Sequence, residues 1–228
     1  MRILLLATSL VWVALAADDS DLLKARDHQD RAALEKMAAE ARAAAEKQPN
    51  DAAAQYRVAL SESYSAEVAI ELHDKASAKN AAQAGVDAAT KAVSMKPDFA
   101  EYQRVLGTLC GQMVSSSSLA GLRYGKCALE AVDKAIELDP KSSMAFVSHG
   151  VGNYYLPQAF GGGIDLAIKD FRKAIELNSK NADAWLWLGL ALRRSNQPGE
   201  AQKAFEHSLE LNPNRAWAHQ QLEKTPSS

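Results

Sequence analysis

The chain has 228 residues, of which 47% are hydrophobic and 24% are charged. This balance is typical of a folded globular protein and excludes a largely disordered one. Lysine and arginine number 26 against 28 aspartate and glutamate residues, so the formal net charge of −2 argues against a nucleic-acid partner. Aromatic residues make up only 7% and alanine is abundant, which favours helices.

Residues 1–16 have the pattern of a secretory signal peptide. Arg2 gives a positive start, an uncharged and mostly apolar run from Ile3 to Leu15 follows, and Ala14 and Ala16 supply a small-x-small cleavage pattern. As a helix this run would span only about 20 Å, short of the roughly 30 Å core of a bilayer. We therefore expect cleavage after Ala16 and a soluble chain that is periplasmic or secreted and not membrane-spanning. No cysteine directly follows the apolar run, so we expect no lipid anchor.

The chain has two cysteines, Cys110 and Cys127. In an exported chain they can form a disulfide, which would close a loop of about 17 residues and stabilise the fold by roughly 3 kcal/mol. The alternative is that they are two small buried side chains on neighbouring helices. The sequence leaves both arrangements open.

Five similar junctions divide the rest of the chain. Each follows an alanine-rich or amphipathic run, and their central residues are Pro49, Pro97, Pro140, Ser179 and Pro213. The separations shrink from 48 to 43, 39 and finally 34 residues. A period of 34 residues is that of a tetratricopeptide repeat (TPR), which is a pair of antiparallel helices.

The last unit, residues 182–213, resembles a TPR at nearly every diagnostic position. Positions 4, 7, 8, 20, 24 and 32 of the repeat hold Trp185, Leu188, Gly189, Ala201, Phe205 and Pro213. The small side chains let two helices approach closely, and the proline ends the second helix. Earlier units keep this skeleton with longer helix-to-helix connections.

We therefore predict an all-α fold, a right-handed superhelical solenoid of antiparallel helix hairpins with about ten helices. Residues 17–228 would form this single TPR-like domain. Its parts are a leading helix (17–48), a lengthened divergent repeat (52–97), a lengthened repeat (100–140), a repeat with a glycine-rich insertion (143–179), the regular TPR (182–213), and a capping helix with a tail (214–228). Whether the first repeat pairs as a regular hairpin is not decided by the sequence.

The sequence carries no recognisable catalytic or cofactor motif. Its five histidines are scattered without zinc-ligand spacing, so we expect no metal site. The glycines at 161–163 lack the Gly-Lys-Ser/Thr of a phosphate loop, and no Gly-x-Ser-x-Gly motif occurs. We expect a non-enzymatic protein that needs no cofactor.

The TPR resemblance implies where a partner would bind. In TPR proteins the first helix of each pair lines a concave groove. By this resemblance, the residues at groove positions include Tyr56, Tyr64, Arg104, Tyr154, Tyr155, Trp187, Arg193 and Arg194. Tyrosine, tryptophan and arginine dominate binding hot spots, so these side chains are candidate contacts for a protein or peptide. The alternative is that several of them pack between repeats.

The insertion in the third unit holds Pro157, Phe160, Gly161, Gly162 and Gly163. Proline would end the first helix, and the glycines permit a tight return. From Gly150 to Leu177 the chain is similar to periplasmic proteins resembling the T component of TRAP transporters. The alternative is a structural plug in which Phe160 packs against the neighbouring helix pair.

Two hypotheses follow for the function. The first is an exported, non-enzymatic scaffold that binds a protein or peptide in its concave groove. The second, implied by the TRAP resemblance, is a periplasmic accessory of a solute transport system that binds a partner and an apolar small molecule. The sequence does not identify the partner or the oligomeric state.

Overall fold

A computed structural model of the chain describes residues 19–116 and 118–225. The predicted signal peptide, residues 1–16, lies outside them. Residues 19–27 form a helix, called the N-terminal helix below. It is followed by α2 (Arg31–Lys47), α3 (Ala52–Glu71), α4 (Lys75–Met95), α5 (Ala100–Ser116), α6 (Ser118–Leu138), α7 (Ser143–Tyr155), a 3₁₀ turn (Gln158–Phe160), α8 (Ile164–Leu177), α9 (Ala182–Arg194), α10 (Pro198–Leu211) and α11 (Ala216–Glu223).

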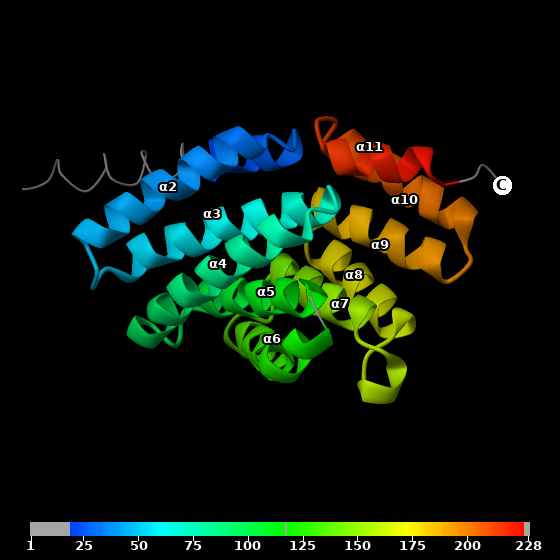
Figure 1. Cartoon of the computed structure of the whole chain (residues 1–228). Coiled ribbons are helices and arrows are strands. Elements are labelled where there is room, and N and C mark those ends of the chain that lie inside the picture. The colour runs from blue at the N-terminus through cyan, green and yellow to red at the C-terminus, as the bar shows by residue number, and fades with distance from the viewer. Residues whose placement is uncertain (1–18, 117, 226–228) are drawn as a thin grey trace, which may run out of the picture.

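These helices form a solenoid of stacked pairs. α3 packs on α4, α5 on α6, α7 on α8, and α9 on α10, while α4 and α5, and α8 and α9, join successive pairs. The pairs follow one another in an arc (Figure 1). No strand occurs in the described ranges. The predicted all-α, TPR-like solenoid is therefore confirmed, and α3 and α4 show that the first repeat also contains a packed pair of helices.

Side-chain caps fix where many of the helices begin. A side-chain oxygen of the residue before the helix accepts a hydrogen bond from a backbone N–H of the first turn at Asp30, Asp51, Asp74, Ser142 and Asn181. Such caps satisfy N–H groups that have no partner within the helix. The polar residues at the repeat junctions thus set the register of the helices.

The expected single leading helix is in fact two helices. Gln29 has a left-handed φ of 54°. The Asp30 amide donates to the Ala25 carbonyl at 2.8 Å, and the Gln29 amide donates to the Arg26 carbonyl at 3.0 Å. This pair of bonds is a Schellman motif, which ends a helix. A glycine usually takes the left-handed position, and here no glycine marks the break in the sequence.

The extra residues of the early repeats lengthen the helices rather than the connections. α3, α4 and α6 have 20, 21 and 21 residues, whereas α9 and α10 have 13 and 14. Alanine has the highest helix propensity, and its abundance in α3 and α4 favours the extension of these two helices. Within the described ranges, none of the helices combines the length and the apolar character needed to cross a bilayer.

Candidate functional site

The inner face of the arc is lined by the first helix of each pair. Contacts join α3 to α5, α5 to α7, and α7 to α9, so these helices lie closer to one another than their partners do. Helices that approach most closely lie on the inside of a curved stack. This surface is called the concave face below. Along one edge of the molecule the N-terminal helix and α11 approach each other (Figure 1).

A cluster of charged side chains occupies the concave face where the two ends meet. The cluster consists of Arg26, Asp27, Glu67, Glu71, Asp183 and Arg215. Arg215 Nη2 lies 2.8 Å from Glu67 Oε1, and Arg215 Nη1 lies 3.1 Å from Glu71 Oε2. The Arg215 side chain is only 1% exposed. A buried charge is unfavourable unless it is paired, and here Glu67 and Glu71 compensate the charge of Arg215.

The N-terminal helix contributes the second arginine of this cluster. Arg26 Nη1 lies 2.8 Å from Asp183 Oδ2 on α9, and its guanidinium carbon lies 5.3 Å from the centre of the Tyr64 ring on α3. The next residue, Asp27, accepts a hydrogen bond of 2.7 Å from Asn212 Nδ2. The N-terminal helix therefore lies across the concave face between α3 and the C-terminal repeat.

The carboxyl groups of the cluster differ in acidity. Burial raises the pKa of Glu67 to about 7, and the neighbouring Glu71 and Asp183 add to the rise against the opposing effect of Arg26 and Arg215. Burial also acts on Asp183, but there the two guanidinium groups outweigh it and the pKa is lowered. The pKa values of Glu67 and Asp183 are therefore shifted in opposite directions, and Glu67 takes up a proton near neutral pH.

Three of the predicted groove residues, Tyr56, Tyr64 and Arg104, pack within the N-terminal half. The Tyr56 hydroxyl donates to Glu101 Oε1 at 3.1 Å, and Arg104 Nε donates to Glu101 Oε2 at 2.7 Å. Arg104 is buried, and Tyr64 lies beneath the guanidinium of Arg26. These side chains therefore contact other side chains of the same chain, and their role as partner contacts stays a prediction.

The C-terminal half of the concave face carries an aromatic surface. It is formed by Tyr154 and Tyr155 of α7, Trp187 of α9, Trp217 of α11, and Arg194. The Tyr154 and Trp187 ring centres are 5.8 Å apart, and those of Trp187 and Trp217 are 5.3 Å apart, with edge-to-face geometry. Tyr155 is 51% exposed. This surface is accessible to a partner.

The two predicted arginines of α9 have different surroundings. Arg193 Nη2 donates to Gln221 Oε1 at 2.6 Å and Arg193 Nη1 to the Gln221 carbonyl at 3.1 Å, so Arg193 fastens α11 to the last repeat. Arg194 is exposed, donates to the Tyr154 carbonyl at 2.7 Å, and has its guanidinium 4.8 Å from the centre of the Tyr154 ring. Arg194 thus belongs to the aromatic surface, whereas Arg193 serves the C-terminal packing.

The glycine-rich insertion folds back on the end of α7. Gly161 and Gly163 have φ values of 88° and 126°, which are unfavourable for other residues. The Gly163 amide donates to the Asn153 carbonyl at 3.0 Å, and the Gly162 amide to the Pro157 carbonyl at 3.3 Å. The side chain of Phe160 lies outside the described part, so its role as a plug stays a prediction.

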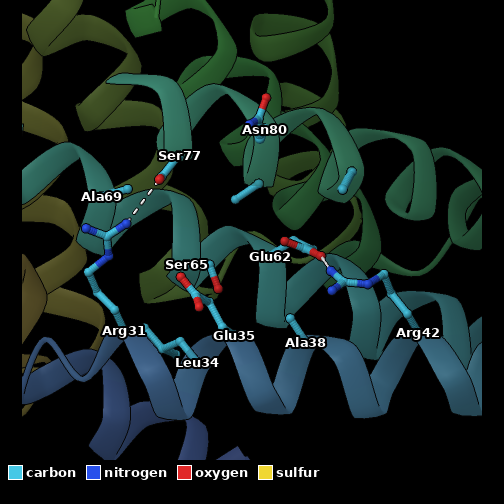
Figure 2. A pocket seen from close by; sticks show the side chains of 12 residues that line it. Arg31, Leu34, Glu35, Ala38, Arg42, Glu62, Ser65, Ala69, Ser77 and Asn80 are labelled. Carbon is cyan, nitrogen blue, oxygen red and sulfur yellow. Dashed lines mark hydrogen bonds and ion pairs between the residues drawn. The ribbon is translucent and has the colours of Figure 1, made fainter. Parts of the chain in front are cut away.

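A recess of about 260 Å³ lies between α2, α3 and α4, away from the predicted groove residues (Figure 2). Arg31 donates to Asp74 at 2.9 Å and to Ser77 at 3.0 Å, and Arg42 pairs with the buried Glu62. Its walls combine charged and polar side chains with Leu34 and several alanines, so the recess has mixed polarity and the apolar ligand stays a prediction. No cluster of metal-ligating side chains occurs in the parts of the chain that the structure describes.

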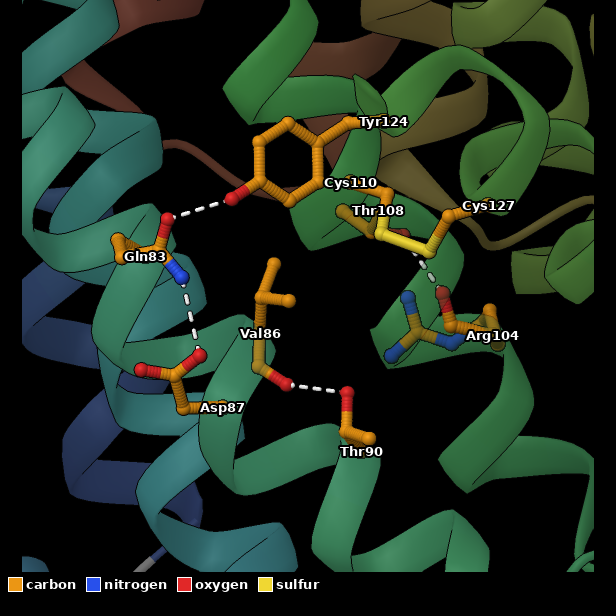
Figure 3. The surroundings of a disulfide bond; sticks show 9 residues. All are labelled: Gln83, Val86, Asp87, Thr90, Arg104, Thr108, Cys110, Tyr124 and Cys127. Carbon is orange, nitrogen blue, oxygen red and sulfur yellow. Dashed lines mark hydrogen bonds between the residues drawn. A yellow bond between two sulfur atoms is a disulfide. The ribbon is translucent and has the colours of Figure 1, made fainter. Parts of the chain in front are cut away.

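Cys110 and Cys127 form a disulfide that joins α5 to α6 (Figure 3). Their Cα atoms are 5.9 Å apart, within the range that a disulfide allows. Nearby, the Tyr124 hydroxyl donates to Gln83 Oε1 at 2.6 Å and links α6 to α4. Of the two arrangements that the sequence left open, the structure has the bridged one.

The stacked helix pairs and the repeat positions define a tetratricopeptide repeat protein. TPR sequence signatures match residues 161–196 and 182–224. Residues 16–158, more than half of the chain, match the family described as regulator of microtubule dynamics protein 1-3. The chain belongs to that family.

Two curated proteins share part of this sequence. Anaphase-promoting complex subunit 3 of Schizosaccharomyces pombe (strain 972) is 28% identical over 93 residues, which is 39% of this chain and 13% of that protein. Small glutamine-rich tetratricopeptide repeat-containing protein 2 of Mycosarcoma maydis is 32% identical over 98 residues, which is 43% of this chain and 26% of that protein. The chain thus spans far less than two thirds of either relative.

A solved structure shares the fold over nearly the whole chain. A thermophilic TPR protein of Thermus thermophilus aligns with a TM-score of 0.62 and 16% sequence identity, covering 95% of this chain and 94% of that chain. The similarity of the insertion to TRAP T-component proteins is not tested by any of these matches and stays a prediction.

Proposed function

We propose that this chain is a non-enzymatic scaffold that binds a protein or peptide segment at the aromatic surface of its concave face. The half-exposed Tyr155 supports the proposal most directly, because it is clustered with Tyr154 and Trp187, and clustered accessible aromatic side chains mark interaction sites. Trp187 and the exposed Arg194 lie beside it, and these residue types supply most of the binding energy in protein interfaces.

The experiment compares partner binding by three variants of the full chain. Tyr155→Ala and Arg194→Ala remove exposed atoms of the aromatic surface, and Leu166→Ala removes a similarly exposed side chain of α8. After crosslinking in cell extract, a partner of the aromatic surface is recovered with wild type and with Leu166→Ala. Its recovery drops at least tenfold with the other two. Equal recovery by all variants would exclude this surface.

We also propose that the chain is exported. The pattern of residues 1–16 and the disulfide between Cys110 and Cys127 support this location, because disulfides persist in oxidising compartments. The intact mass of the purified chain tests it: processing gives a chain that begins at Ala17 with no alkylatable thiol. A chain that keeps Met1 and reacts at both cysteines would contradict export.

The family name supplies a second candidate function, the regulation of microtubule dynamics, which the match over residues 16–158 favours. This role requires a chain in the same compartment as microtubules, so it conflicts with export. Co-sedimentation of the purified chain with polymerised tubulin tests it directly. Binding that Tyr155→Ala abolishes and Leu166→Ala preserves would place tubulin on the aromatic surface, and no sedimentation would remove this candidate.

A further inference from the structure

The N-terminal helix contacts the solenoid through one side only. Leu22, Ala25 and Arg26 are buried, whereas Leu23 and Lys24 are exposed. Spacings of three and four residues place the buried side chains on one face of a helix. Leu22 and Ala25 belong to the apolar core of the N-terminal half. The segment therefore has the form of an amphipathic helix laid in a groove.

The polar contacts of this helix reach elements that are remote in sequence. Arg26 pairs with Asp183 at 2.8 Å, 157 residues further along the chain. Asp27 accepts from Asn212 at 2.7 Å, 185 residues away. A short turn at Gln29 joins the helix to α2, and the helix is not part of any of the stacked helix pairs.

The groove side presents carboxylates that need a cation. Asp183 and Glu67 both lie near Arg26, and Arg215 is the other guanidinium beside them. If the N-terminal helix leaves, these partly buried acids lose one of the two guanidinium groups beside them, which is unfavourable. A segment that replaces the helix must therefore bring a positively charged side chain, as the N-terminal helix brings Arg26.

We propose that the concave face between α3 and α9 is a helix-binding groove, and that the N-terminal helix occupies it in cis in place of a partner. The partner would be an amphipathic helix with the pattern of Leu22 to Asp27: an apolar residue, a small residue three positions later, then arginine and aspartate. This inference rests on the proposed scaffold function and adds to it a second binding surface, separate from the aromatic surface, whose partner has this chemistry.

The test uses the full chain and a fluorescent peptide with the sequence of residues 17–30. The double variant Leu22→Asp/Arg26→Ala weakens the helix in cis and leaves the groove side unchanged. Leu23→Ala/Lys24→Ala alters only the exposed side of the same helix and is the matched control. By fluorescence anisotropy, the weakened variant binds the peptide at least tenfold more tightly than wild type or the control does. A peptide with alanine in place of Arg26 binds at least tenfold more weakly. Equal binding by all proteins would overturn the proposal.

Hydrogen exchange of the wild-type chain keeps the proposal testable if the double variant does not fold. We expect the amides of residues 22–27 to exchange faster than the buried amides of α3, because the N-terminal helix opens alone. If the amides of residues 22–27 and those of α3 exchange at the same rate, through one common unfolding event, the proposal is overturned. The variant Tyr155→Ala leaves peptide binding unchanged, so failure of this inference is distinguishable from failure of the aromatic surface.

Discussion

The guanidinium group of Arg215 and the carboxylate of Glu71 form an ion pair across 144 residues of sequence, with Nη1 3.1 Å from Oε2. Both side chains are almost fully buried, with exposures of 1% and 2%. In an open solenoid each repeat contacts only its neighbours. This pair instead joins the first repeat to the end of the last one, so the two ends of the chain stabilise each other.

Replacing Arg215 by methionine is expected to lower the free energy of unfolding by about 3 kcal/mol, because Glu67 and Glu71 then lose their buried partner. Urea denaturation measures the change. The control is Arg172→Met, whose ion pair with Glu200 is exposed and should change stability by less than about 0.5 kcal/mol. A loss of stability no larger than that of the control would mean that the charged cluster does not stabilise the contact between the two ends of the chain.

Glu67 should make stability depend on pH. Its pKa is about 7 in the folded chain against 4.5 for the free side chain, so between these values the folded state holds a proton that the unfolded state has released. The stability from Glu67 is therefore full below about pH 4.5 and is lost as pH rises through 7. We expect a loss on the order of 2 kcal/mol from pH 5 to pH 8, which Glu67→Gln removes.

Urea denaturation of wild type and Glu67→Gln at several pH values measures this difference. The exposed Glu130, which pairs with Lys126 at 3.6 Å, provides the control Glu130→Gln. That variant should keep the slope of the wild type. If Glu67→Gln also keeps it, another group is responsible for the pH dependence.

The repeat architecture was accessible from the sequence because it depends on local patterns. Gly189 and Phe205, identified from their TPR positions, do meet at the helix seam. The contact between the two ends of the chain could not be predicted from the sequence. Arg215 and Glu71 look like ordinary surface charges in the sequence, and no periodicity connects residues so far apart.

The candidate site was predicted only in part for the same reason. The aromatic residues Tyr155 and Trp187 follow from the repeat positions, and they do lie together. That the N-terminal helix covers Tyr64 depends on the break at Gln29, a left-handed residue that is not glycine. The contact of Arg193 with Gln221 cannot be predicted from the repeat positions, because it depends on how α11 packs on the last repeat.

The disulfide should contribute measurably to the stability of the pair α5 and α6. Its sequence separation is 17 residues, for which the loss of chain entropy in the unfolded state corresponds to about 3 kcal/mol. We expect Cys110→Ala/Cys127→Ala to lower the free energy of unfolding by this amount relative to the oxidised chain. Dithiothreitol should destabilise wild type similarly and leave the variant unaffected. An equal effect of dithiothreitol on both proteins would show that the bridge is not the cause.

Two glycines allow the close packing of the repeats to be separated from helix propensity. A Cβ atom on Gly189 would lie 2.6 Å from the buried Phe205 ring, whereas one on Gly152 meets nothing within 4 Å. Gly189→Ala should therefore lower the free energy of unfolding by about 1–3 kcal/mol through overpacking. Gly152→Ala should raise it by about 0.5–1 kcal/mol, since alanine is the better helix former. Thermal and urea unfolding of both variants decide the point. Both glycines lie within helices, so changes of opposite sign in the free energy of unfolding would isolate the contact with Phe205. An increase in stability in both variants would mean that the Phe205 ring moves aside.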